Sequence, residues 1–417
     1  MAVTEIPWGD GTSDKLYFSA PASEGNQTVE VSSDANAGAE RSKTVNFNAP
    51  GVSPQPLAIV QLGAGGVDPD AWLKDGDTHL WINILNDYQL EQQIRIRLKG
   101  TIDWGDGTAK ETANVNAYTT FTHTYSEKGK YRIDLHPTSG TFYIGGGSSS
   151  YNVMGARETG SDWRAAALYQ VEVGTSIINA ISSYAFYYCM GLKRAYIPAN
   201  ITTLSTYTFT SCVSLAEVIF EAPDRITAAS IQNAFYYCHS LQKINAFSIK
   251  GTATINGTVR NCYCLKEFTI PEGNTSIAAN SLANMYGLAK LFCLPTSAPT
   301  VANSNAFSNL PATCAIKVPK GSLSSYQGAS SWSAYSSQMS EAAAITLTLT
   351  SVSSGNLEPM ADLNGSYTTT LTPDPGKTLG TVTVKMGGVD ITNTAYSNGV
   401  VSIANVTGNI TITATAA

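Results

Sequence analysis

Hydrophobic positions return at a regular interval across the middle of the chain. From about residue 177 to residue 339 one frame recurs six times: a large apolar anchor, then in most copies Cys three residues later and Leu three residues after that. The anchors, spaced 23 to 26 residues apart, are Phe186, Phe209, Phe235, Val259, Leu282 and Phe307. A fixed period in the twenties predicts a solenoid, because stacked turns bury a shared core that a single turn could not bury.

Each copy of the frame also predicts its own core side chains. Residues three apart lie on one side of a helical or 3₁₀ turn, and the short apolar stretch that follows, such as 195–197, is typical of a strand that proline ends. Stacking should then bury the cysteines in reduced form as small hydrophobic residues. The predicted core consists of Phe186, Cys189, Leu192, Phe209, Cys212, Leu215, Phe235, Cys238, Leu241, Cys262, Leu265 and Phe307.

This frame resembles the BspA-type leucine-rich repeat, which occurs in bacterial surface proteins and in phages of gut bacteria. The Ala-Phe, Cys, Leu and Ile-Pro positions of that family are all present. Val259 and Leu282 replace Phe and Met285 replaces Cys, but these substitutes are also apolar, so the expected fold is the same. The family's C-terminal closing pattern is found at 316–321, Tyr326, Trp332 and Tyr335.

Period-two alternation marks the two ends of the chain as β-sheet modules. At the N-terminus it covers 15–19, 28–32, 43–47 and 57–61, with turn residues between. Residues 1–65 resemble a BACON domain, and we expect them to form a small docking module. From residue 345 the alternation resumes, and residues 341–417 resemble a bacterial Ig-like repeat common in phage fibres, through 382–392 and 406–412.

Residues 66–145 carry a motif that predicts a tight turn between strands. Gly-Asp-Gly in 102–108 predicts a tight turn in which a carboxylate accepts backbone N–H bonds, and two side chains further on should hold the neighbouring strand. The four residues are Trp104, Asp106, His123 and Tyr125. With the Gly-x-Tyr-x-Ile of 129–133, the motif resembles a PKD-type β-sandwich. Asp103 and Asp106 could instead bind calcium, although turn aspartates are commoner.

The sequence thus predicts a mainly β protein, in which β-sandwich (Ig-like) modules flank a BspA-type leucine-rich-repeat solenoid at 146–340. Only 13% of residues are charged and the formal net charge is −6, which is typical of an extended exported-type protein and argues against nucleic acid as a partner. No apolar run reaches 18 residues, so no membrane insertion is expected. The first residues show no signal-peptide pattern, so we expect either a removed signal or a protein that is never secreted.

No motif for catalysis is present. None of the four histidines lies near a nucleophile motif, and we predict neither an enzyme nor a cofactor. A pair of glycosidase carboxylates needs no local motif, so the sequence does not exclude one. Cys262 and Cys264 with His239 suggest zinc, but no second pair of ligands follows, and we predict no metal.

Binding is the function that the repeats favour. If Phe and Cys point inward, the two residues between them point partly outward, and in two repeats both are Tyr. The candidate aromatic ladder is Tyr187, Tyr188, Tyr207, Tyr236, Tyr237 and Tyr263. Tyrosine supplies a large contact area at low entropic cost and packs on sugar rings or on protein partners. In the alternative interpretation these rings only pack between turns.

Together the resemblances imply a non-enzymatic phage virion protein, a head fibre, capsid decoration or tail-fibre component. Its N-terminal module would dock onto other virion proteins, and its solenoid would attach to a glycan or protein of the host surface. The expected location is then the virion surface. The alternative is a cell-surface adhesin or lipoprotein of Bacteroidetes that binds host or matrix ligands. A homo-oligomer is left open, since no coiled-coil heptads are present.

Overall fold

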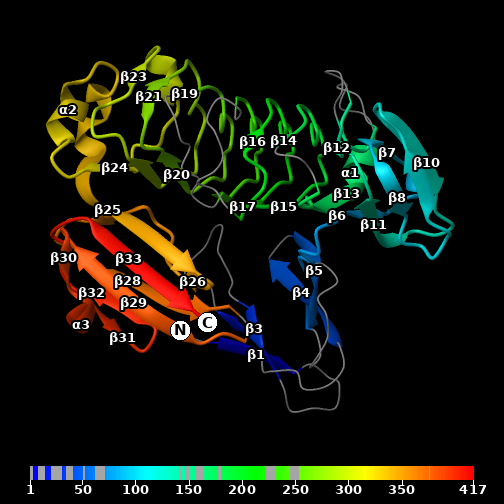
Figure 1. The fold of residues 1–417 in the computed structure, drawn as a ribbon, viewed down its shortest axis with the longest axis horizontal. Coiled ribbons are helices and arrows are strands. Elements are labelled where there is room, and N and C mark those ends of the chain that lie inside the picture. The colour runs from blue at the N-terminus through cyan, green and yellow to red at the C-terminus, as the bar shows by residue number, and fades with distance from the viewer. Residues whose placement is uncertain are drawn as a thin grey trace. The chain divides into compact units, whose positions relative to one another are not determined.

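The chain forms two compact units, Met1–Trp72 and Leu73–Ala417, each considered by itself. The computed structural model (Figure 1) describes residues 3–7, 15–19, 31–33, 41–49, 52–61, 71–140, 142–145, 151–155, 163–176, 180–221, 232–244, 253–374 and 376–417. Strands take up 42% of the structure and helices 8%, which confirms the predicted mainly β class. Among the described residues no helix is both long and apolar enough to cross a membrane.

The N-terminal unit is built from short antiparallel strands. One sheet has the order β1-β2-β3, and β4 pairs with β5 as a hairpin. The strands are β1 (Val3–Pro7), β2 (Lys15–Ser19), β3 (Val31–Ser33), β4 (Arg41–Ala49) and β5 (Val52–Gln61). Three of the predicted strands, 15–19, 43–47 and 57–61, lie in β2, β4 and β5. The resemblance of this unit to a BACON domain stays a prediction.

The second unit begins with a two-sheet β-sandwich. One sheet has the order β10-β7-β12, and the other contains β6-β11-β8-β9. Every second residue is buried in β7 and β8, as the period-two pattern requires, whereas nearly all of β6 is buried. The elements are β6 (Thr78–Ile84), η1 (Asp87–Gln89), β7 (Glu91–Arg97), β8 (Lys99–Asp103), β9 (Glu111–Asn114), β10 (Thr119–Thr124), β11 (Gly129–Pro137) and β12 (Tyr143–Ile144).

The repeats form a solenoid of about six turns, as predicted. Strands of successive turns pair in parallel, for example β15 with β17, β17 with β18, and β14 with β16. Figure 1 shows β15 and β17 side by side on one face of the solenoid and β14 and β16 on the other. The elements are α1 (Trp163–Ala167), β13 (Leu168–Glu172), β14 (Ala180–Ile181), β15 (Arg194–Ile197), β16 (Thr203–Leu204), β17 (Glu217–Phe220), β18 (Lys243–Ile244), β19 (Ala253–Ile255), β20 (Glu267–Ile270), β21 (Asn274–Ile277), β22 (Lys290–Cys293), β23 (Thr300–Val301), η4 (Ser304–Phe307) and β24 (Ala315–Pro319).

The sandwich closes the N-terminal end of the solenoid. Strand β13 pairs antiparallel with β6 of the sandwich and in parallel with β15, so a single sheet passes from one to the other. The other sheet of the sandwich is connected to the solenoid through the backbone of Val153. Its carbonyl accepts from the N–H of Arg95 on β7, and its N–H donates to the carbonyl of Ala185 in the first turn, both at 2.7 Å. One continuous hydrophobic core therefore extends from Leu80 to Met339.

A charged cluster around the buried His79 lies at this junction. The ring of His79, on β6, bonds Asp134 at 2.7 Å and Asp75 at 2.8 Å, and Arg132 pairs with Asp134 at 2.7 Å. Burial alone would lower the pKa of His79, but its two carboxylate partners outweigh this effect and raise it. Burial would raise the pKa of Asp134, but its bonds to His79 and Arg132 lower it to about 2. The two carboxylates therefore favour the protonated form of His79.

The C-terminal sandwich shares a strand with the solenoid. The first half of β25 pairs in parallel with β24, and its second half pairs in parallel with β33. The predicted boundary at 340/341 lies inside this strand, and the sandwich has a hydrophobic core of its own. The elements are α2 (Leu323–Gly328), η5 (Ser333–Gln338), β25 (Met339–Thr350), β26 (Val352–Ser354), β27 (Met360–Asp362), β28 (Tyr367–Pro373), β29 (Leu379–Met386), β30 (Val389–Asp390), α3 (Thr392–Ala395), β31 (Tyr396–Ser397), β32 (Val400–Ile403) and β33 (Ile410–Ala416).

Candidate binding surface on the solenoid

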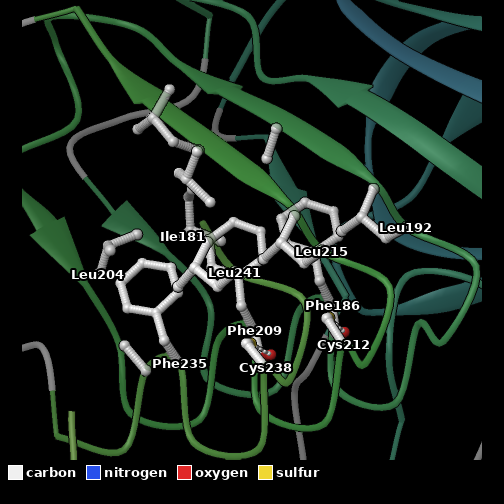
Figure 2. Close-up of a cluster of buried hydrophobic side chains, with 14 of the residues drawn as sticks. Ile181, Phe186, Leu192, Leu204, Phe209, Cys212, Leu215, Phe235, Cys238 and Leu241 are labelled. Carbon is white, nitrogen blue, oxygen red and sulfur yellow. Dashed lines mark hydrogen bonds between the residues drawn. The ribbon is translucent and has the colours of Figure 1, made fainter. Parts of the chain in front are cut away.

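The anchors of successive turns stack inside the solenoid. The ring centroids of Phe186 and Phe209 are 5.0 Å apart with planes 13° apart, and those of Phe209 and Phe235 are 5.5 Å and 5° apart. Figure 2 shows the three phenyl rings in one row among the leucines of the same turns. Val259 and Leu282 take the anchor position in the next two turns and are fully buried. All twelve predicted core residues are buried.

The cysteines of the frame connect one turn to the next. The thiol of Cys212 donates to the carbonyl of Phe186 at 2.9 Å, and the thiol of Cys238 donates to that of Phe209 at 3.1 Å (Figure 2). Cys262 repeats the bond to Phe235 at 3.2 Å. All seven cysteines are free, and burial raises the pKa of these three thiols. The sulfurs therefore lie inside, as small core residues with one weak hydrogen bond each.

The closing segment covers the last turn. Trp332 and Tyr326 are fully buried, and their polar atoms donate to the carbonyls of Pro299 and Pro295, each at 2.8 Å. The Trp332 ring lies 4.9 Å from the ring of Phe307. Both ends of the repeat core are thus covered, which an open-ended solenoid needs.

Each of the first five turns bends through two left-handed positions four residues apart, and the sixth turn has one, at Asn309. Asparagine and glycine adopt this conformation easily, whereas other L-residues pay about 1–2 kcal/mol. The later turns use Asn or Gly, and the amides of Asn261, Asn284 and Asn309 form a ladder with bonds of 2.7 Å. The earlier turns place Tyr184, Tyr188, Tyr207 and Tyr237 there, with φ between 55° and 64°.

A connected row of rings crosses the third, fourth and fifth turns. Adjacent centroids are 4.3, 5.6, 4.4 and 5.4 Å apart. We call this row the aromatic file; in order it consists of Tyr236, Tyr237, His239, Tyr263 and Tyr286. Side-chain exposure reaches 37% at Tyr237, 36% at Tyr263 and 58% at Tyr286. The file therefore presents aromatic surface to solvent.

The other predicted ladder residues belong to a second group on the first two turns. Tyr184 and Tyr207 stack with centroids 5.1 Å apart and planes 12° apart, and Tyr187 contacts both Tyr184 and Tyr188. These four rings are half-buried. The ring contacts thus gather the predicted residues into two groups, with Tyr187, Tyr188 and Tyr207 in one and Tyr236, Tyr237 and Tyr263 in the other.

Sequence reasoning missed two members of the file. His239 and Tyr286 directly follow the Cys position of the frame, as Tyr263 does. This shared register position was visible in the sequence and could have identified them. The His239 ring stacks on that of Tyr263 with planes 8° apart, and burial lowers its pKa, which favours the neutral ring.

Charged and aromatic side chains occupy different faces of the solenoid. On the parallel sheet, Arg194 pairs with Glu217 and Lys290 with Glu267, each at 3.6 Å across neighbouring strands. The bends that carry the tyrosines are residues 182–191, 205–214, 232–240, 256–264 and 279–287. They contain a single charged residue, Arg260, whose guanidinium lies 5.2 Å from the centroid of the Tyr236 ring. The aromatic file is therefore set in a nearly uncharged surface.

The turn motif of the first sandwich holds two strands together. Asp106 accepts the backbone N–H of Thr108 at 3.1 Å and bonds His123 at 2.8 Å, and Tyr125 donates to the carbonyl of Trp104 at 2.8 Å. Burial would raise the pKa of Asp106, but these bonds outweigh it and lower the pKa. These bonds therefore stabilise the fold of the sandwich.

Neither metal alternative finds a ligand set in the part of the chain that the structure describes. The Cys262 thiol is buried and bonded to Phe235, while Cys264 is exposed. Asp103 accepts the N–H of Gly105 at 3.0 Å and pairs with Lys110 at 3.2 Å. No three His, Cys, Asp or Glu side chains are gathered there as a metal ion would need.

Comparison with known proteins bears on the solenoid. A leucine-rich repeat protein from Bacteroides ovatus ATCC 8483 is 17% identical over 42% of this chain and 42% of its own, with a TM-score of 0.30. A leucine rich cell surface protein from Faecalibacterium prausnitzii A2-165 is 14% identical over 42% of this chain and 78% of its own, with a TM-score of 0.16. These TM-scores are too low to carry an argument, and no curated protein matches. The family model for the BspA type leucine rich repeat region matches residues 179–314 in six copies, as the repeat pattern predicts.

Proposed function

We propose that the protein is a non-enzymatic adhesive protein that binds a ligand on another surface through the aromatic file. The observation that carries this proposal is the exposure of Tyr237, Tyr263 and Tyr286 in one connected row on three successive turns. Exposed aromatic residues of this kind are typical of binding surfaces, because they supply contact area with few rotatable bonds.

The energetics of Tyr237 support a role beyond folding. Its left-handed backbone, at φ 61°, costs about 1–2 kcal/mol, and each of its ring contacts returns about 0.5–1.5 kcal/mol. Asparagine would avoid most of that cost, and the same position holds Asn261 and Asn284 in the next two turns. Stability alone therefore gives little reason for a tyrosine here. Packing between turns is the better account for Tyr184 and Tyr207, whose rings cover each other.

Bead adhesion tests this proposal. Beads coated with the full chain are applied to mucin, matrix proteins and intact cells, and compared with beads coated with the double variant Tyr237→Asn, Tyr286→Asn. We expect the variant to lose adhesion. Tyr88→Asn is the matched control, because Tyr88 is 60% exposed but lies in η1 of the first sandwich. Equal adhesion by wild type and double variant would reject the proposal.

Two locations are proposed for the protein, a bacterial cell surface and a phage virion. A bacterial cell-surface adhesin is supported by the matched repeat type, which is typical of bacterial surface proteins. A phage virion protein is supported by the resemblances of the flanking modules alone. In that case residues 1–65 would dock onto the particle. Antibodies against the chain should label either intact cells or purified virions, and a chain without residues 1–65 that still enters virions would contradict the docking role.

A further inference from the structure

We infer that the ligand of the aromatic file is an uncharged carbohydrate; this inference rests on the proposed function and names its ligand class. The bends at 182–191, 205–214, 232–240, 256–264 and 279–287 contain Tyr, Ser, Thr and Asn in abundance and no acidic residue. Their one permanent charge is Arg260, which lies over the Tyr236 ring. The surface thus offers rings, hydroxyls and amides, and almost no charge.

Uncharged sugars have chemical groups that pair with the rings, hydroxyls and amides of this surface. The C–H face of a pyranose ring packs against an aromatic ring, and its hydroxyls exchange hydrogen bonds with amides and hydroxyls. The Tyr286 ring is the most exposed of the file and is tilted 57° from that of Tyr263, so the two faces do not cover each other. An open ring face is what a sugar needs for stacking.

The amide ladder fixes one polar side chain close in sequence to the exposed end of the aromatic file. Asn284, which is half-buried, stands two residues before Tyr286, and its amide donates to the buried Asn261 of the preceding turn. Each ladder amide is held by its neighbour at 2.7 Å, so its orientation is set before a ligand arrives. Preorganised groups lose little entropy on binding, which favours recognition of a flexible glycan.

Other ligand classes fit this surface less well. Sulfated or sialylated glycans and other anions are bound by clustered Arg and Lys, which the bends do not contain. Protein partners are usually anchored by Trp, Tyr and Arg, and complementary charges across the interface steer and orient them. The charges of this solenoid are on the parallel sheet instead, in pairs such as Arg194 with Glu217.

Glycan arrays with the full chain test this inference. The arrays carry uncharged polysaccharides (galactomannan, xyloglucan, arabinan) and neutral mucin-type oligosaccharides beside heparin and sialylated glycans. We expect neutral hits whose affinity, measured by calorimetry, is the same in 50 mM and 500 mM NaCl. Tyr263→Ser and Tyr286→Ser should each weaken that affinity about tenfold, and the control Tyr88→Asn should leave it unchanged. Circular dichroism checks that each variant is folded.

The outcomes separate the ligand class from the proposed function. Hits confined to heparin or sialylated glycans, or affinity that falls with salt, would overturn the neutral-glycan inference. The absence of glycan hits, together with bead adhesion that depends on Tyr237 and Tyr286, would overturn it while leaving the adhesive function in place. Neutral-glycan binding that persists in both serine variants would overturn the assignment of the ligand to the aromatic file.

Discussion

At the scale of single residues, the left-handed bends decide which side chains the solenoid can display. Asn and Gly adopt the left-handed conformation at little cost. A tyrosine there is destabilised by its backbone conformation and stabilised by the contacts of its ring. In the fourth to sixth turns, Asn261, Asn284 and Asn309 stabilise the stack through their amides. In the third turn, Tyr237 contributes exposed aromatic surface instead. Neighbouring copies of one repeat thus serve different purposes.

Tyr237→Asn should change the free energy of unfolding by less than about 1 kcal/mol. The relief of the left-handed conformation, about 1–2 kcal/mol, offsets the loss of ring contacts to Tyr236 and His239. Asn284→Ala is the contrasting variant, because it keeps φ at 61° and loses both ladder bonds, at a cost of about 2–4 kcal/mol. Urea denaturation measures both. A large decrease in the free energy of unfolding of Tyr237→Asn would mean that the Tyr237 ring serves to stabilise the fold.

One thiol should react in the native protein. Cys264 is exposed, whereas the other six cysteines are buried, and burial raises the pKa of Cys314 to about 11 and those of the core thiols further. Titration with DTNB at pH 8 should therefore modify one cysteine quickly and all seven only after denaturation. Rapid modification of more than one would show that the core thiols are accessible.

At the scale of elements, the pairing of β6 with β13 connects the first sandwich to the solenoid and carries the His79 cluster. The raised pKa of His79 means that its protonated form stabilises the fold at pH values below its ordinary pKa of 6.5. This contribution is lost as the pH rises through the higher pKa of the folded state. The contribution of Asp134 runs the other way: it is present above pH 3.8 and is lost as the pH falls through about 2.

The free energy of unfolding of the wild-type protein should therefore fall as the pH rises from 6 through the raised pKa of His79. His79→Gln removes the titrating group, so its unfolding energy should be lower at pH 6 and should change less over the same range. Urea denaturation at several pH values measures this slope. The same slope in both proteins would mean that another group carries the pH dependence. His136→Gln is the matched control, because His136 is a half-buried histidine whose ring also pairs with a carboxylate, that of Asp77, at 2.5 Å.

At the scale of the whole molecule, the continuous core makes the first sandwich and the solenoid interdependent. Leu80 on β6 is opposite Val171 on β13, and both belong to the core that extends to Met339. Leu80→Ala should cost about 2–5 kcal/mol and reduce hydrogen-exchange protection in β15 as well as in β6. The C-terminal sandwich has its own core, so Val384→Ala should leave protection in β15 unchanged. Independent responses of β6 and β15 to Leu80→Ala would contradict this coupling.

The solenoid and its core could be predicted from the sequence because burial within one turn depends on nearby residues. Phe186, Cys189 and Leu192 meet inside the same turn, so their spacing alone determines which way they point. The fixed period then repeats that arrangement in every copy. Trp332 and Tyr326 could be assigned to the closing segment only through the resemblance of their region to the family's closing pattern.

The tertiary structure decided what meets across turns and between modules. His239 and Tyr286 join the aromatic file only because parallel register places them beside Tyr263, a contact between residues 23 or 24 positions apart in sequence. The division of β25 between the solenoid and the C-terminal sandwich likewise depends on pairing with two distant strands, β24 and β33. Sequence periodicity specifies the side on which a residue is buried, whereas its neighbours across turns follow from strand register and backbone conformation, which only the folded chain sets.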